Sequence, residues 1–151
     1  MQSQQVLFPH WMRGVLLLTA AYNVFWGAFI AWFPETFYQW VTQTELPNPA
    51  VIPWQGAAVI AMAVVYTMAA VHPGKYWFLT AFGAFTKLAG GIWFYLAILE
   101  QNVGDQGWYH LIMNDAAWIP LLLFIAFRAK KYGEWQKTLP PPPPPSANAR
   151  G

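Results

Sequence analysis

Four long apolar segments, separated by short polar or proline-containing stretches, constrain this chain more than any other feature. They cover Trp11–Phe33, Trp54–Val71, Tyr76–Leu99 and Trp108–Phe127. Their lengths match the ~20 residues that an α-helix needs to cross a hydrocarbon core of about 30 Å. Because a segment in lipid must satisfy its own backbone hydrogen bonds, the pattern predicts an all-α bundle of four transmembrane helices.

The composition supports lipid as the solvent of this chain. Charged residues make up only 9 % of the sequence, against roughly 25 % in soluble domains. The net charge of +2 does not indicate nucleic-acid binding, because the basic residues stand at the ends of the predicted helices. Cysteine is absent, which excludes disulfides, thiolate metal sites and thiol redox catalysis.

The basic residues predict the orientation in the membrane. Seven of them fall on the side that holds both chain ends, and none falls on the other: Arg13, Lys75, Arg128, Lys130, Lys131, Lys137 and Arg150. The opposite side holds Glu35, Glu45, Glu100 and Asp105. This asymmetry predicts that both termini lie in the cytoplasm. No cleavable signal peptide is evident, since the first apolar run exceeds the 7–15 residues of a signal core.

The remaining segments divide the chain into three parts. Residues 1–10 form a cytoplasmic N-terminal segment, residues 11–130 the membrane domain and residues 131–151 a cytoplasmic tail. In the first outer loop, Phe37, Trp40 and Val41 stand at i, i+3 and i+4, which predicts a short interfacial helix. The tail contains six consecutive prolines, Pro140 to Pro145, which favour an extended polyproline II strand. It is either a stiff disordered end or a docking strand.

Polar residues at similar depth in three of the predicted helices form the candidate site. Lys87 and Asp115 each lie ten to twelve residues, or roughly 15–18 Å, from the cytoplasmic helix ends. An isolated charge there costs at least ~2.5–3.5 kcal/mol, so we expect the two to pair. Asn23 shares this level and is expected to satisfy a leftover donor or acceptor. Asn114 is expected to point about 100° away from Asp115. The cluster is either a packing device or part of a ligand or ion path.

Local sequence around these residues predicts close contacts. Gly83, Gly90 and Gly91 lie near the face of Lys87, so a neighbouring backbone can approach it. Pro120 has no N–H and frees the carbonyl of Ala116, which predicts a distortion one turn past Asp115.

Several chemistries find little support in the sequence. Haem b needs histidines at matching depth on facing helices, but His10, His72 and His110 all fall near helix ends. A metal shared by His10 and His72, or a Schiff-base pigment on Lys87, has no further residues to support it. The sequence therefore assigns no catalytic residue, no metal and no defined cofactor. Lipids or other lipophiles, such as a quinone, carotenoid or sterol, remain possible ligands of the aromatic residues.

The segments YNVFWGAFIAWFP, FGAFTKLAGG and MNDAAWIPLLLF together resemble small four-helix bacterial membrane proteins of the DoxX-like type. The resemblance covers residues 11–130 and leaves out the oligoproline tail. It implies a bacterial inner-membrane bundle in which Lys87 and Asn114–Asp115 form one constellation, and it implies no reaction.

Two functions follow as hypotheses. The first is a non-catalytic accessory subunit of a larger membrane complex, respiratory or photosynthetic, because the chain has hardly any extramembrane domain and has many aromatic residues. Its partners would be lipids and other membrane subunits, with no nucleic acid. The second is a small transporter or lipophile-binding protein that uses Lys87, Asp115 and Asn23. An accessible cavity reaching Lys87 would favour the second hypothesis, and a dry, packed ion pair the first. A membrane oxidoreductase would require a bound cofactor.

Overall fold

The fold is all-α in a computed structural model, which describes residues 8–45, 50–99 and 104–140. The α-helices are α1 (His10–Trp32), α2 (Pro34–Thr42), α3 (Val51–Val71), α4 (Trp77–Phe94), α5 (Asp105–His110) and α6 (Trp118–Gln136). Two π-helical segments, η1 (Tyr95–Leu99) and η2 (Leu111–Ala116), continue α4 and join α5 to α6. No strand occurs within the described ranges.

Four of the continuous helices are long and apolar enough to cross a membrane, which confirms the predicted class. They are His10–Trp32, Val51–Val71, Trp77–Leu99 and Asp105–Gln136. The protein is therefore a multi-pass membrane protein with a helical bundle. Its oligoproline run lies almost wholly outside the described residues, as do Glu100 and Arg150.

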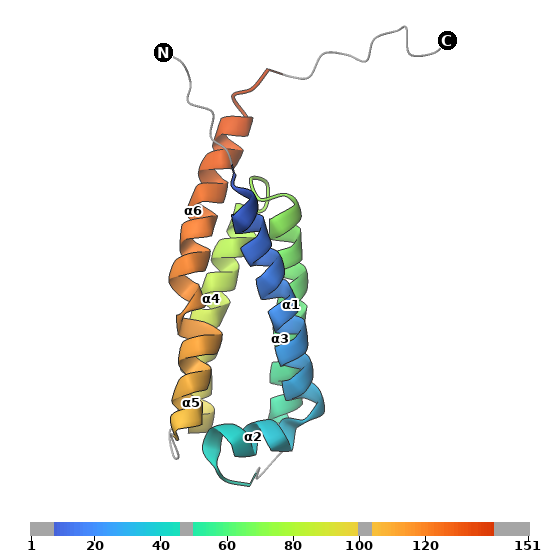
Figure 1. The fold of residues 1–151 in the computed structure, drawn as a ribbon, viewed down its shortest axis with the longest axis vertical. Helices are drawn as coiled ribbons and strands as arrows, with labels where there is room; N and C mark the ends of the chain where they lie inside the picture. The colour runs from blue at the N-terminus through green and yellow to red at the C-terminus, as the bar shows by residue number, and fades with distance from the viewer. Residues whose placement is uncertain (1–7, 46–49, 100–103, 141–151) are drawn as a thin grey trace, which may run out of the picture.

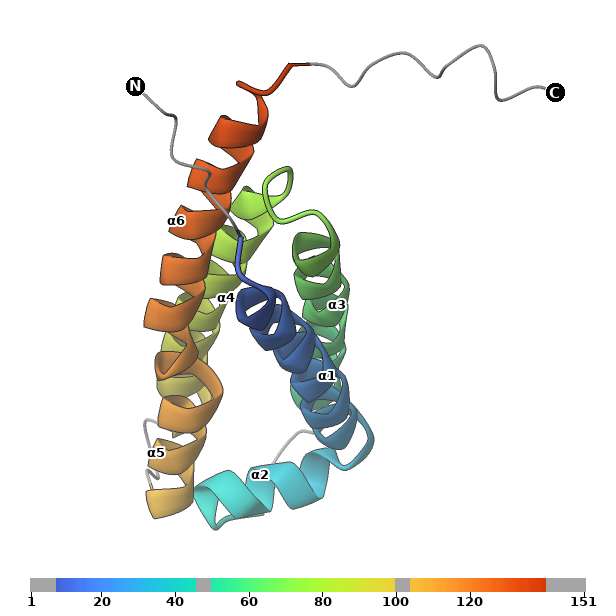
Figure 2. The ribbon, with the colours of Figure 1, turned by 45° about the horizontal axis from the view of Figure 1, so that its top comes forward.

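The bundle consists of two helix pairs. α1 packs mainly against α3, and α4 packs mainly against α6. Figures 1 and 2 show the pairs close together at the end where the chain begins and farther apart at the end where α2 crosses. A tight turn at residues 72–76 joins α3 to α4 and makes them antiparallel neighbours, as predicted.

Two helix boundaries differ from the sequence prediction. α3 begins at Val51 rather than Trp54, because Pro53 falls in the first turn, where its missing N–H has no helical partner to lose. α6 continues to Gln136 instead of ending at Phe127. Residues 128–136 are polar enough to leave the membrane, yet nothing in their sequence stops a helix. The first part of the predicted tail is therefore helical.

Small residues let α1 and α3 approach closely. A Cβ atom added at Gly27 would lie 2.7 Å from the carbonyl oxygen of Gly56, and one added at Gly56 would lie 2.6 Å from that of Gly27. Both distances are shorter than a real contact, so only glycine fits at this crossing. Without a hydrophobic force between helices in lipid, such close backbone packing is a main source of association.

The short helix α2 is present, but its apolar side packs into the protein. Phe37 and Val41 are fully buried, in a cluster with Ile30, Phe94 and Leu99. α2 therefore closes one end of the bundle. The spacing of Phe37, Trp40 and Val41 indicated that the helix has an apolar face. It did not indicate whether lipid or protein would cover that face.

His110 lies near a helix end, as expected, and its side chain is buried there. It is 2 % exposed and lies among the rings of Trp26, Phe37 and Phe94, with centroids 5.7, 5.3 and 4.6 Å away. Neither ring nitrogen has a hydrogen-bond partner among the described residues. His110 thus fills the aromatic end of the bundle under α2.

Candidate functional site

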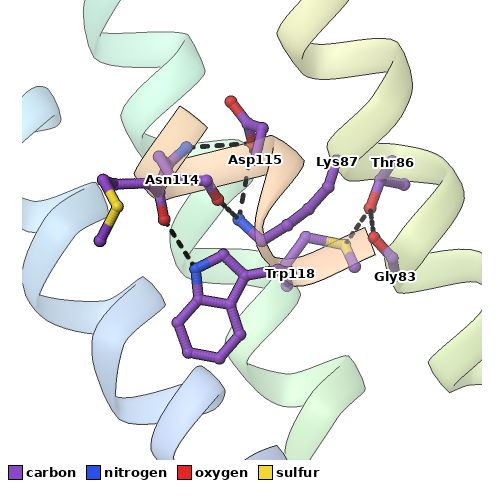
Figure 3. A network of polar contacts seen from close by, with 8 residues as sticks. Gly83, Thr86, Lys87, Asn114, Asp115 and Trp118 are labelled. Carbon is purple, nitrogen blue, oxygen red and sulfur yellow. Dashed lines mark hydrogen bonds and ion pairs between the residues drawn. The ribbon is translucent and has the colours of Figure 1, made fainter. Parts of the chain in front are cut away.

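Lys87 of α4 and Asp115 of η2 meet in the middle of the bundle. The Nζ atom of Lys87 lies 3.6 Å from Oδ1 of Asp115, and both side chains are buried. The predicted pairing is confirmed. A shorter contact also forms, because Nζ donates a hydrogen bond to the backbone carbonyl of Asn114 at 2.6 Å (Figure 3). The ammonium group therefore bridges a carbonyl and a carboxylate of adjacent residues.

The π-helical geometry of η2 changes the pairing of its backbone carbonyls. The N–H of Ala117 bonds to the carbonyl of Ile112, five residues earlier, instead of to that of Met113. The indole N–H of Trp118 donates to the carbonyl of Met113 at 2.9 Å. Lys87 donates to the next carbonyl, that of Asn114. In lipid such donors replace water.

The distortion expected from Pro120 begins earlier than predicted. η2 covers Leu111–Ala116 and so includes Asp115, instead of following it. Pro120 lacks the N–H that would bond to Ala116 in an α-helix, and the π-turn moves the irregular hydrogen bonding ahead of the proline. The same change corrects the prediction for Asn114. Its side-chain amide donates to Oδ1 of Asp115 at 3.1 Å instead of pointing away.

Asn23 of α1 joins the cluster without the hydrogen bond predicted for it. It is 2 % exposed and its Oδ1 has no partner among the described residues. It lines the same cavity as Lys87, Asn114 and Asp115. All four predicted site residues therefore surround one space, although only three of them contact one another.

This cavity has a volume of about 470 Å³ and lies chiefly between α3 and α4. The residues that line it are mostly apolar along α3 and become polar near Lys87: Val51, Trp54, Gln55, Ala58, Val59, Met62, Tyr66, Thr86, Gly90 and Trp93, together with the four site residues. Val51 and Trp54 at the α2 end are 49 % and 77 % exposed, and Trp93 of α4 is 40 % exposed, so the cavity is open to the surroundings of the bundle. Its volume is in the range of small-molecule sites, about 300–1,000 Å³.

The three glycines near Lys87 have different neighbours. Gly83 accommodates the ring of Tyr66, because an added Cβ would overlap that ring. Gly91 faces Asp115, whose Cβ would lie 3.4 Å from the added atom. Gly90 has nothing within 4 Å of an added Cβ and borders the cavity. Gly83 therefore leaves space for an aromatic ring, Gly91 for a carboxylate side chain, and Gly90 borders the cavity.

A second cavity of about 410 Å³ touches the ion pair from between α4 and η2. Apart from Lys87 and Asp115 its walls are apolar or aromatic, including Leu88, Ile92 and Trp108. The ion pair therefore borders both cavities. An amphipathic molecule can reach its polar atoms from either one.

Sequence reasoning did not single out Gln55 or Tyr66 as site residues. Both line the larger cavity, and the Oε1 of Gln55 and the hydroxyl of Tyr66 have no hydrogen-bond partner within the described part of the chain. A glutamine inside an apolar segment is a detectable signal. Among the described residues no three His, Asp or Glu side chains come together as metal ligands. The arrangement can bind a polar group in an apolar setting, and it presents no nucleophile–base pair.

The comparisons with protein-family models, with curated proteins and with solved structures found no match to this chain.

Proposed function

We propose that this protein binds a lipophilic molecule inside the membrane, as a small transporter or a ligand-binding protein. The observation that supports this is the cavity of about 470 Å³ that reaches Lys87. A pair that served packing alone would be enclosed on all sides, as polar groups buried in a bundle usually are. Here the ammonium and carboxylate border open space, and apolar residues of α3 and α4 extend from them to the opening.

We further propose the bacterial inner membrane as the location, with both termini in the cytoplasm and an origin among DoxX-like proteins. The support for the orientation is the position of the basic residues at one end of the bundle. Three of them sit over aromatic rings there: Lys75 over Tyr76, Lys130 over Trp77 and Lys131 over Phe127, at 5.0, 5.2 and 4.5 Å. Cations and aromatic rings together are typical of a cytoplasmic membrane interface.

A matched pair of glycine variants tests ligand binding. Gly90→Phe places a ring in the cavity, whereas Gly14→Phe places one on the exposed side of α1; neither new Cβ meets an atom within 4 Å. Both changes remove a helix-interior glycine and should be tolerated. We expect a lipophile to copurify with the wild type and with Gly14→Phe, and to be at least ten-fold depleted in Gly90→Phe, by solvent extraction and mass spectrometry. Equal lipid profiles in all three proteins would contradict the proposal.

The accessory-subunit hypothesis is a second proposal. α4 presents Phe78, Phe82 and Phe85 at i, i+4 and i+7 on one exposed face, which suits a partner helix as well as lipid. The proline-rich tail is a further candidate contact with a neighbouring subunit. Purification in mild detergent separates the two proposals, because a subunit would elute with partner chains and a self-sufficient binding protein would not.

A further inference from the structure

Four residues that line the larger cavity carry a polar side-chain atom without a hydrogen-bond partner among the described residues. The side-chain oxygens of Asn23, Gln55 and Asn114 are buried and have no partner among the described residues. The hydroxyl of Tyr66 is likewise buried without a partner. All four residues line the cavity, and Asn23, Tyr66 and Asn114 are more than nine-tenths buried. Buried polar groups are rarely left unpaired, so four of them around one space indicate a molecule that pairs with them.

The chemistry of these atoms restricts the polar end of that molecule. An amide oxygen only accepts, so the ligand must supply hydrogen-bond donors, whereas the phenol of Tyr66 can donate to a ligand oxygen. A hydroxyl group does both, with its hydrogen directed to an amide oxygen and its lone pair to Tyr66. An ether or ester oxygen could satisfy Tyr66 but none of the three amide oxygens.

The charges of Lys87 and Asp115 restrict the head group of the ligand further. Lys87 and Asp115 already form a neutral pair, with Nζ 3.6 Å from Oδ1. A carboxylate or phosphate head would leave the buried cluster with a net negative charge, and an ammonium head would leave it net positive. Either result carries the large penalty of an uncompensated charge in a low-dielectric site. A neutral head group keeps the cluster neutral.

The long axis of the cavity accommodates an elongated apolar body. Its α3 wall extends from Tyr66 to Val51, roughly 22 Å at 1.5 Å per residue. Apart from Gln55, that wall is apolar or aromatic between Tyr66 and Val51: Met62, Val59, Ala58 and Trp54. A chain or fused-ring body can therefore lie along α3 while its head stays near Lys87.

We propose that the larger cavity takes a neutral lipophilic alcohol or phenol, with its hydroxyl group among Asn23, Asn114 and Tyr66 and its apolar part along α3. This deepens the proposed function, on which it rests, by naming the ligand class. It predicts that molecules whose head group carries a net charge are not the specific occupants.

The test compares four photoactivatable probes that share one long alkyl chain with a diazirine and differ only in the head group: alcohol, methyl ether, carboxylic acid and primary amine. Each is added to the purified protein in nanodiscs of zwitterionic phospholipid. Labelled peptides are identified by mass spectrometry, and relative affinities come from competition with the unlabelled compounds. We expect the alcohol to label α3 and α4 around the cavity, and to bind about ten-fold more tightly than the ether, the effect of one hydrogen bond.

Variants test which residues form hydrogen bonds with the hydroxyl group of the ligand. Asn23→Leu removes an acceptor of similar size and should reduce the preference for alcohol over ether several-fold. Tyr66→Phe removes only the phenolic oxygen and should weaken alcohol and ether alike. Thr67→Val is the matched control, because the hydroxyl of Thr67 bonds to the carbonyl of Ala63 in its own helix, outside the cavity. It should change neither affinity.

The outcomes separate the inference from the proposed function. If no probe labels the residues around the cavity, both fail. If the probes label it but the ether binds as well as the alcohol, or the acid or amine binds more tightly, the protein binds lipophiles and the assignment to alcohols is wrong. The comparison among the four heads on the wild-type protein gives this answer even if a variant does not fold.

Discussion

At the scale of single residues, Lys87 has two acceptors rather than one. Its ammonium lies 2.6 Å from the carbonyl oxygen of Asn114 and 3.6 Å from the carboxylate of Asp115. The hydrogen bond is therefore made to the backbone, and the carboxylate supplies the opposite charge at a longer distance. Lys87 thus donates to a carbonyl of the π-helical segment and also neutralises the carboxylate of Asp115.

This arrangement predicts an order of stabilities for variants of the pair. Lys87→Met leaves both the carbonyl and the carboxylate unpaired and should cost about 3–5 kcal/mol. Asp115→Asn keeps the short hydrogen bond of Lys87 and should cost less. The double variant Lys87→Met/Asp115→Leu carries no buried charge and should be more stable than Lys87→Met alone. Thermal unfolding in detergent, followed by near-ultraviolet circular dichroism, measures all four proteins. A double variant less stable than both single variants would rule out this view of the pair.

The sequence predicted which residues come together better than it predicted how they do so. The pairing of Lys87 with Asp115 follows from depth and charge, since two isolated charges are costly in lipid. The roles of Asn114 and Asn23 could not be predicted, because they depend on a helix register. An α-helix turns 100° per residue, but η2 is wider, and this brings the amide of Asn114 to the carboxylate beside it. Hydrophobic patterns give helix positions and do not reveal a π-turn.

At the scale of helices, contacts between glycines hold α1 against α3. Gly56→Leu should push the two helices apart, because a Cβ at this position would meet the backbone of Ala31 and Gly27. Overpacking of this kind typically costs about 1–3 kcal/mol. Gly90→Leu is the matched control on another helix, with open space around its Cβ. We expect a lower unfolding temperature in detergent for Gly56→Leu alone; equal losses in both variants would show that the seam tolerates side chains.

Element boundaries could be predicted where the sequence contains a stop signal and not elsewhere. α1 ends at Trp32, two residues before Pro34, and α3 ends at Val71, two residues before Pro73; the predicted ends were Phe33 and Val71. The end of α6 has no such signal. The predicted end at Phe127 rested only on where the apolar residues stop. The burial of His110 was also beyond prediction, since it depends on α2 folding back over the bundle and not on any local property of residues 105–111.

At the scale of the whole molecule, two helix pairs are joined at opposite ends by different means. At one end, the turn at residues 72–76 joins α3 of one pair to α4 of the other. At the other end α2 fills the space between the pairs with Phe37 and Val41. The larger cavity lies between these two closures. Its wall begins beside Val51 and Trp54 at the α2 end and reaches Tyr66 in the middle of the bundle.

The proposed orientation can be tested on single cysteines, because the natural chain contains none. Glu45→Cys and Asp105→Cys mark the α2 end, and Lys75→Cys and Lys137→Cys mark the end with the basic residues. Since lysine and arginine resist transfer across the membrane, we expect an impermeant maleimide to label the first two in intact bacterial spheroplasts and the last two only after lysis. The reverse pattern would invert the topology and leave the bundle intact. Labelling of Glu45→Cys and Asp105→Cys from different sides would contradict four spans, because two complete crossings separate these positions in the fold and must return the chain to the same face.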